Sequence, residues 1–336
     1  MPTNSELLWP DSFTRLSFTR VGSALAAAQS LQGLAADLKR TLPLPLSQAV
    51  AQRLIGLYTP LANYSFGKVS SEPDTPFILG INGAQGSGKS LAAVILQHLL
   101  QGLGVSVCQL SIDDVYLERA RRLQLAEQVH PLLATRGVPG THDVPLALDI
   151  FAQLRQASVS SHTQIPRFNK ATDDRHALSQ WDTVIGRPQV IIFEGWCIGA
   201  QAQPSGDLRQ PINRLEREQD SGGIWRGFVN DCLHQYQALF QQLDMLIMLK
   251  APSFAQVLQW RLLQEQQLRH SAAVRGVAQT HIMQRDQVTR FVAHYERLTR
   301  WMLQQMPARA DILFHLEENH NTAKIECPMA YKARVQ

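Results

Sequence analysis

The chain has 336 residues, of which 45% are hydrophobic and 18% are charged, and its formal net charge is +4. This length and composition are sufficient for a full α/β core with an added lobe, so we expect one elaborated domain. The basic residues are spread along the chain without interleaved aromatic pairs, which argues against nucleic-acid binding and fits an anionic substrate and nucleotide.

The four cysteines stand far apart and lack CxxC spacing, so neither a zinc site nor a disulfide framework is predicted. No basic segment followed by an apolar stretch resembles a signal peptide, and no apolar run approaches the roughly 18 residues that a membrane span needs. We therefore expect a soluble, cytoplasmic protein that does not act at a membrane.

Residues 1–74 precede the nucleotide-binding core and carry no catalytic motif. Leu25 to Leu38 and Leu46 to Leu57 have amphipathic helical spacing, and Pro43 and Pro45 separate the two segments. We interpret this part of the chain as a helical N-terminal extension packed on the core.

A glycine-rich motif follows the first apolar strand. The run Phe77 to Ile81 leads into Gly-Ala-Gln-Gly-Ser-Gly-Lys-Ser, and helical apolar spacing begins directly after it. Strand, glycine loop and helix in this order predict a P-loop, in which backbone N–H groups and the helix dipole bind phosphates. Lys89 would reach the β- and γ-phosphates, and the Ser90 hydroxyl would bind Mg²⁺. We assign nucleotide binding to Gly83, Ala84, Gln85, Gly86, Ser87, Gly88, Lys89, Ser90 and Leu91.

Val105 to Ile112 has the length of a strand and ends in two aspartates, Asp113 and Asp114. Ligands of an open parallel sheet lie at the carboxyl ends of its strands, so a carboxylate here would lie beside the P-loop. Phosphorylation of an alcohol needs an acceptor for the hydroxyl proton near the γ-phosphate, and Asp113 is our candidate. At an arbitrary strand end a capping aspartate is the commoner alternative, but the nearby P-loop favours the catalytic interpretation.

Residues 118–188 interrupt the alternation of strands and helices with a polar, basic insertion. Arg136 to Asp143 and Pro166 to Lys170 combine turn residues with groups that can bind a hydroxylated anion. Each segment alone is more typical of a solvated turn. Two of them beside one nucleotide site favour an acceptor-binding insertion.

Val190 to Phe193 is a nearly continuous apolar strand, as expected in a sheet covered on both faces, and Glu194 ends it. An acidic residue here has the Walker B position, where it binds Mg²⁺ directly or through water. A helix-capping or structural acid is the alternative.

Residues 254–270 form a predicted helix between the fourth and fifth strands, and Arg261, Glu265 and Arg269 lie along one row of it. Such a row is as typical of a solvated face as of a lid. In a lid, Arg261 and Arg269 would close on the phosphates and neutralise charge during transfer.

Five strands are expected near residues 77–82, 105–112, 189–194, 243–249 and 309–316. Helical crossovers between them would cover both faces of the sheet. We therefore predict a P-loop NTPase-type α/β fold with a doubly wound, five-stranded parallel sheet, in a kinase domain that comprises residues 75–336.

Five motifs in order carry a family resemblance: Gly80 to Ser90, Ser111 to Tyr116, Arg136 to Asp143, Pro166 to Lys170 and Phe193 to Trp196. Together they resemble D-glycerate 3-kinase and its kinase-like relatives, among the P-loop kinases that include uridine kinase, phosphoribulokinase and bacterial pantothenate kinase. The resemblance implies that Asp113 activates the acceptor hydroxyl, that Glu194 ends the third strand of these kinases, and that Tyr116, His142 and Asp143 line the acceptor pocket.

The resemblance implies transfer of the γ-phosphoryl group of Mg·ATP to an alcohol of a small hydroxy acid, with D-glycerate as the first candidate. Its carboxylate would need a cation, for which we consider Arg167, Lys170 and Arg175. Val115 and Val138 depart from the family pattern, so pantothenate, a nucleoside or another sugar acid stays open as acceptor. A P-loop switch or metallochaperone is the alternative outside kinases, but the guanine-reading Asn-Lys-x-Asp spacing is absent after Asn169.

Overall fold

The computed structural model describes residues 9–10, 47–275 and 283–328. Its centre is a six-stranded sheet with the order β10-β9-β8-β1-β7-β2. The five predicted strands are β1 (Phe77–Gly83), β2 (Val107–Ser111), β7 (Val190–Gly195), β8 (Met245–Lys250) and β9 (Ile312–Leu316). All neighbouring pairs among these five are parallel, which confirms the predicted parallel arrangement. The predicted count of five strands was wrong, because a sixth strand, β10 (Thr322–Glu326), pairs antiparallel with β9 at the edge.

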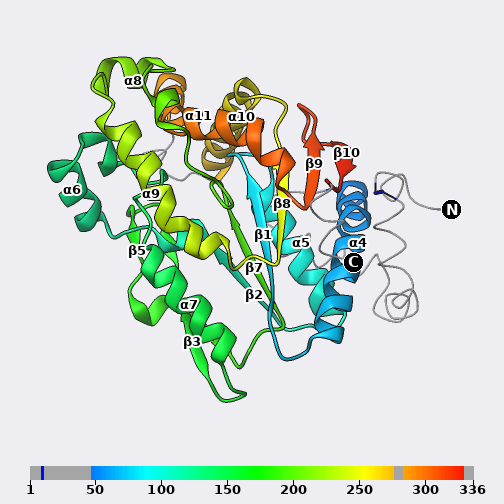
Figure 1. Cartoon of the computed structure of the whole chain (residues 1–336). Coiled ribbons are helices and arrows are strands. Elements are labelled where there is room, and N and C mark those ends of the chain that lie inside the picture. Colours follow the sequence, from blue (N-terminus) through cyan, green and yellow to red (C-terminus); the bar gives the residue numbers. More distant parts are fainter. Residues whose placement is uncertain (1–8, 11–46, 276–282, 329–336) are drawn as a thin grey trace.

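Helices cover both faces of the sheet (Figure 1). The helices α4 (Gln48–Ser71) and α5 (Lys89–Gly102) pack on the face to which Leu79 and Ile192 point. On the opposite face, Ile191 and Phe193 contact a core built by α7 (Val144–Gln156), α9 (Ile224–Phe240) and α11 (Arg285–Gln305). Successive side chains of a strand alternate between its faces, so these apolar strands fill both cores.

The N-terminal extension was predicted to contain two helices. The first, Leu25 to Leu38, lies outside the described residues. The second is α4, which continues beyond the expected end at Leu57 and contains Pro60. Tyr58 of α4 packs against Phe314 of β9, with ring centroids 5.6 Å apart, so this helix belongs to the hydrophobic core of the sheet.

The segment between β2 and β7 contains α6 (Arg119–Gln128), α7 and two small antiparallel sheets. The first sheet pairs β3 (His162–Ile165) with β6 (Asp182–Ile185), and the second pairs β4 (Phe168–Asn169) with β5 (Asp174–Arg175). The remaining elements are α8 (Arg214–Gln219), α10 (Phe254–Arg275) and β10 (Thr322–Glu326).

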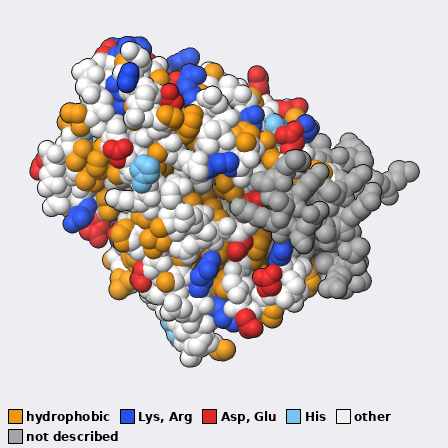
Figure 2. Space-filling model, in the orientation of Figure 1, with side chains coloured by type: hydrophobic (Ala, Val, Ile, Leu, Met, Phe, Trp, Pro, Cys, Tyr) orange, Lys and Arg blue, Asp and Glu red, His pale blue; other side chains and the backbone are white. Residues whose placement is uncertain are grey.

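None of the described helices combines the length and apolarity that crossing a bilayer requires. On the face shown in Figure 2, Lys and Arg side chains are interspersed with acidic and apolar ones. The described basic side chains on this face therefore form no single basic field.

Candidate active site

The P-loop joins β1 to α5 and has the backbone geometry of a phosphate-binding turn. Gly86 and Gly88 have φ of +78° and +89°, left-handed conformations that favour glycine. A Cβ atom at Gly86 would lie 2.8 Å from Cβ of Trp260, so a larger residue does not fit there. Lys89 and Ser90 occupy the first turn of α5, where the helix dipole favours an anion.

A cavity of about 1250 Å³ lies at the carboxyl ends of β1, β2 and β7. The P-loop residues Gln85, Gly86, Lys89 and Ser90 form one side of it. The residues on the other sides come from the ends of β2 and β7, from the 118–188 segment and from α10 and α11, and they include Asp113, Tyr116, Arg136, Arg167, Lys170, Glu194, Arg261 and Tyr295.

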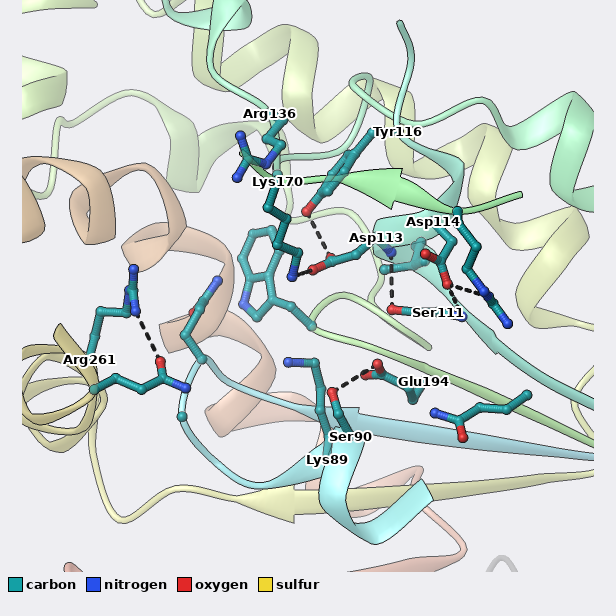
Figure 3. Close-up of a pocket in the computed structure, with 18 of the residues that line it drawn as sticks. Lys89, Ser90, Ser111, Asp113, Asp114, Tyr116, Arg136, Lys170, Glu194 and Arg261 are labelled. Carbon is teal, nitrogen blue, oxygen red and sulfur yellow. Dashed lines mark hydrogen bonds and ion pairs between the residues drawn. The ribbon is translucent and has the colours of Figure 1, made fainter. Parts of the chain in front are cut away.

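Ser90 and Glu194 lie together at the predicted Mg²⁺ site (Figure 3). The Ser90 hydroxyl donates to Oε1 of Glu194 at 3.0 Å, whereas Oε2 is buried and has no hydrogen-bond partner. Burial raises the pKa of Glu194, although the nearby Lys89 opposes this shift. A hydroxyl and a carboxylate with a free buried oxygen are ligands that suit Mg²⁺.

Asp113 lies in the short 3-10 helix Ile112–Val115 directly after β2. The Tyr116 hydroxyl donates to its Oδ1 and the Lys170 ammonium to its Oδ2, both at 2.8 Å (Figure 3). Burial by itself would raise the pKa of Asp113, but Lys170, Lys89 and these hydrogen bonds outweigh it and hold the pKa well below its usual range. The carboxylate is therefore ionised at neutral pH.

A capping aspartate was the alternative to a catalytic one at the end of this strand, and the neighbouring Asp114 has that capping role. Its side chain accepts from the backbone N–H of Ser111 at 3.4 Å, and its own backbone N–H donates to the Ser111 hydroxyl, so the two residues form a capping box. It also binds Arg167 at 2.8 Å. These contacts fix the turn that presents Asp113, whose catalytic role stays a prediction.

The segment Arg136 to Asp143 lies alongside the end of β2. Asp143 donates its backbone N–H to the carbonyl of Val115 at 2.7 Å, and the Tyr116 ring stacks on His142 at 4.6 Å between centroids. His142 Nδ1 lies 2.7 Å from the Tyr236 hydroxyl, and burial lowers the pKa of His142 to about 4. Neutral His142 thus packs against the ring of Tyr116 and does not line the cavity.

Only some of the residues predicted to bind the acceptor line the cavity. Asp143 caps α7 by accepting from the backbone N–H of Leu146, and it pairs with Arg175 at 3.2 Å. Neither Asp143 nor Arg175 lines the cavity. Of the six residues predicted for the acceptor, the cavity is lined by Tyr116, Arg167 and Lys170.

The two arginines of the predicted lid face different pockets. Arg261 lines the main cavity and forms an ion pair with Glu265, one turn further along α10. Arg269 donates to the carbonyl of Met283 at 3.2 Å and lines a separate pocket of about 370 Å³. The structure therefore brings Arg261, but not Arg269, to the phosphate side.

Sequence reasoning did not single out Arg136 as a binding residue, although it begins one of the predicted polar segments. In the structure its side chain lines the cavity beside Tyr116 and Lys170 (Figure 3). The available signal was its place before Gly137, which has a φ of +128°. A positive φ of this kind favours glycine, so the Arg-Gly pair indicated a turn at this position.

Comparison with known proteins gives no matching family model. An uncharacterised kinase of Schizosaccharomyces pombe is 35% identical over 228 residues, which cover 66% of this chain and 78% of that protein. The chloroplastic D-glycerate 3-kinase of Arabidopsis thaliana is 26% identical over 70% of this chain, and the match spans 50% of the plant protein.

The solved structure of D-glycerate 3-kinase from Cryptococcus neoformans aligns with a TM-score of 0.62 at 23% identity. The alignment covers 80% of this chain and 97% of the fungal one, and it supports the fold. A pantothenate kinase of Shewanella amazonensis is 28% identical over 53% of this chain and 63% of its own length.

Proposed function

Since this chain belongs to the P-loop kinase superfamily, we propose that it transfers the γ-phosphoryl group of ATP to an alcohol of a small hydroxy acid, with D-glycerate as acceptor and 3-phosphoglycerate as product. One observation carries this proposal. An ionised carboxylate, Asp113, and a phosphate-binding loop ending in Lys89 and Ser90 line the same cavity. This is the arrangement that phosphorylation of an alcohol requires.

The proposed reaction is an in-line displacement. The acceptor hydroxyl donates its hydrogen bond to Asp113, which takes the proton as the new bond between the acceptor oxygen and the γ-phosphorus forms. The bond from that phosphorus to the β,γ-bridging oxygen breaks, and ADP leaves. Lys89 and the P-loop N–H groups hold the phosphates in line throughout.

Ser90 and Glu194 would hold the Mg²⁺ that accompanies ATP in this family. When bound, Mg²⁺ supplies positive charge to the β- and γ-phosphates. The unpartnered Oε2 of Glu194 supports this assignment, because a buried carboxylate oxygen without a partner is costly in the absence of a ligand.

A screen of acceptors tests the proposal. Purified protein with Mg²⁺ and ATP should release ADP when D-glycerate is added, and mass spectrometry should identify 3-phosphoglycerate. Turnover with another acceptor and none with D-glycerate would refute the glycerate assignment but retain the kinase. Preference for GTP without any acceptor-stimulated hydrolysis would favour a nucleotide-dependent switch instead.

Pantothenate is the second candidate acceptor. The match to a pantothenate kinase over half of the chain favours it, and pantothenate also combines a carboxylate with a primary alcohol. The same ADP-release screen separates the two acids, because each is supplied alone at equal concentration.

The pairing of Lys170 with Asp113 predicts a pH effect. Lys170 lowers the pKa of Asp113, so Lys170→Met should raise that pKa. Asp113 must be ionised to accept the proton, and the acidic limb of kcat/KM should therefore move to higher pH. Lys324→Met, at an exposed lysine outside the cavity lining, is the control. An acidic limb that stays in place in Lys170→Met would show that Asp113 does not set it.

A further inference from the structure

The cations that face the cavity differ in how fully they are neutralised. Three of them have carboxylate partners that pair with no other cation in the described chain. These pairs are Arg167 with Asp114 and Asp182, Lys170 with Asp113, and Arg261 with Glu265. An acceptor anion could bind these cations only in competition with a carboxylate already in place.

Apart from Lys89, which we assign to the phosphates, Arg136 is the exception, because it shares its carboxylate with a second arginine. Oδ1 of Asp173 binds Arg136, and Oδ2 lies 3.0 Å from Nη2 of Arg122. The Arg122 side chain is 0% exposed, and its guanidinium also donates to the carbonyls of Leu117, Ala134 and Asp173. These carbonyls satisfy the N–H groups but supply no counter-charge.

One carboxylate therefore serves two guanidinium groups. A fully buried charge depends on its counter-charge, because water does not reach it. Asp173 therefore cannot neutralise both arginines, and an anion can reach the remaining positive charge at Arg136, whose side chain is 24% exposed and lines the cavity, but not at the buried Arg122. In the described part of the chain, Asp173 is the carboxylate that pairs with either arginine.

The surroundings of Arg136 hold it in position. The Tyr295 hydroxyl donates to the Arg136 carbonyl at 3.1 Å, and a Cβ atom at Gly137 would lie 1.9 Å from that hydroxyl. The guanidinium carbon lies 5.4 Å from the centroid of the Phe168 ring. Asp173 itself has a φ of +58°, a strained conformation for a residue with a side chain, of the kind that clusters at ligand-binding sites.

The location of Arg136 matches the geometry of a hydroxy acid. Figure 3 shows Arg136, Tyr116 and Lys170 on one side of Asp113, and Lys89 and Ser90 on the other. An acceptor whose hydroxyl binds Asp113 and faces the P-loop would therefore direct its other end towards Arg136. A guanidinium fork suits a carboxylate, which it can bind through two parallel hydrogen bonds.

We propose that Arg136 binds the carboxylate of the acceptor and selects acids over neutral alcohols. This inference rests on the proposed kinase function. Loss of the guanidinium should weaken binding of the acid without altering the phosphate side of the site. It should also spare the fold, because Arg122 then keeps Asp173 to itself.

The test compares acceptors that differ only in charge. In Arg136→Met, we expect the KM for D-glycerate to rise about 10- to 100-fold, the effect of losing charge-assisted hydrogen bonds. The KM for ATP and the kcat/KM for glyceramide, the neutral amide of the same acid, should stay at their wild-type values. Arg136→Lys keeps the charge without the fork and should give an intermediate KM. Arg214→Met, at an exposed arginine outside the cavity lining, is the control.

Three results would overturn the proposal: an unchanged KM for D-glycerate, an equal loss with glyceramide, or a rise in the KM for ATP. If Arg136→Met does not fold, Arg136→Lys decides by the same comparison. If the wild type phosphorylates pantothenate and not D-glycerate, the measurement is repeated with pantothenate and pantothenol, so that the glycerate assignment fails separately from the role of Arg136. A wild-type enzyme that accepts only uncharged alcohols would refute both the glycerate assignment and the role of Arg136.

Discussion

Asp113→Asn should lower kcat by about 10²- to 10⁴-fold, the contribution typical of a positioned general base. The amide keeps the size of the side chain, and its one oxygen can still accept the hydrogen bond of either Tyr116 or Lys170, which donate to different oxygens of the carboxylate. It cannot take the proton of the acceptor hydroxyl. The Kd for ATP should stay close to the wild-type value, because the P-loop and the Ser90–Glu194 pair are unchanged.

Stopped-flow or steady-state ADP release gives kcat, and calorimetric titration with ATP gives the Kd. Asp231→Asn is the matched control, since Asp231 is an exposed aspartate of α9 outside the cavity lining. Retained turnover in Asp113→Asn would remove Asp113 from the mechanism. A parallel loss of ATP binding would indicate damage to the nucleotide site instead of loss of a base.

The parallel sheet and the positions of the principal acidic residues could be predicted because each depends on local sequence. Apolar runs of strand length are visible without knowing what packs on them, and the carboxyl ends of parallel strands meet at one edge. Asp113 and Glu194 therefore came out beside the P-loop. The strand β10 could not be found in this way, because this antiparallel edge strand buries only Ile325 among its five residues.

The pairing of charged side chains depends on contacts between distant segments, and sequence does not reveal it. Arg175 forms an ion pair with Asp143 and donates a hydrogen bond to the Tyr116 carbonyl. Arg167 forms ion pairs with both Asp114 and Asp182. Both arginines had been candidates for the acceptor carboxylate. Arg175 does not line the cavity, and the ion-pair partners of Arg167 distinguish it from Arg136, whose own partner is shared.

Helix geometry explains the separation of the two predicted lid arginines. Eight residues along an α-helix correspond to about 12 Å of rise and about 80° of rotation. Arg269 therefore points away from the line of Arg261, and it lines the pocket between α10 and α11. A row spaced at i, i+4 and i+8 marks neighbouring positions on a helix but not a common target for the first and last of them.

Glu194→Gln should raise the Mg²⁺ concentration needed for half-maximal activity about 10- to 100-fold. The amide retains an oxygen that can accept from Ser90 but loses the negative charge that attracts the cation. We also expect kcat at saturating Mg²⁺ to fall, because positive charge near the transferring group is less well positioned. The fold should be retained, since burial raises the pKa of Glu194 and a neutral amide is easier to bury.

Titration of ADP release with Mg²⁺ measures the first effect, and the Mg²⁺ dependence of the Kd for ATP measures it without turnover. Glu317→Gln, at an exposed glutamate outside the cavity lining, should leave both curves in place. If Glu194→Gln keeps the wild-type Mg²⁺ dependence, Glu194 is a structural acid and Ser90 does not bind the metal with it. If the melting temperature of Glu194→Gln instead falls sharply, Oε2 of Glu194 has a stabilising partner within the protein. The metal assignment then loses its main support, which is the lack of a partner for this oxygen.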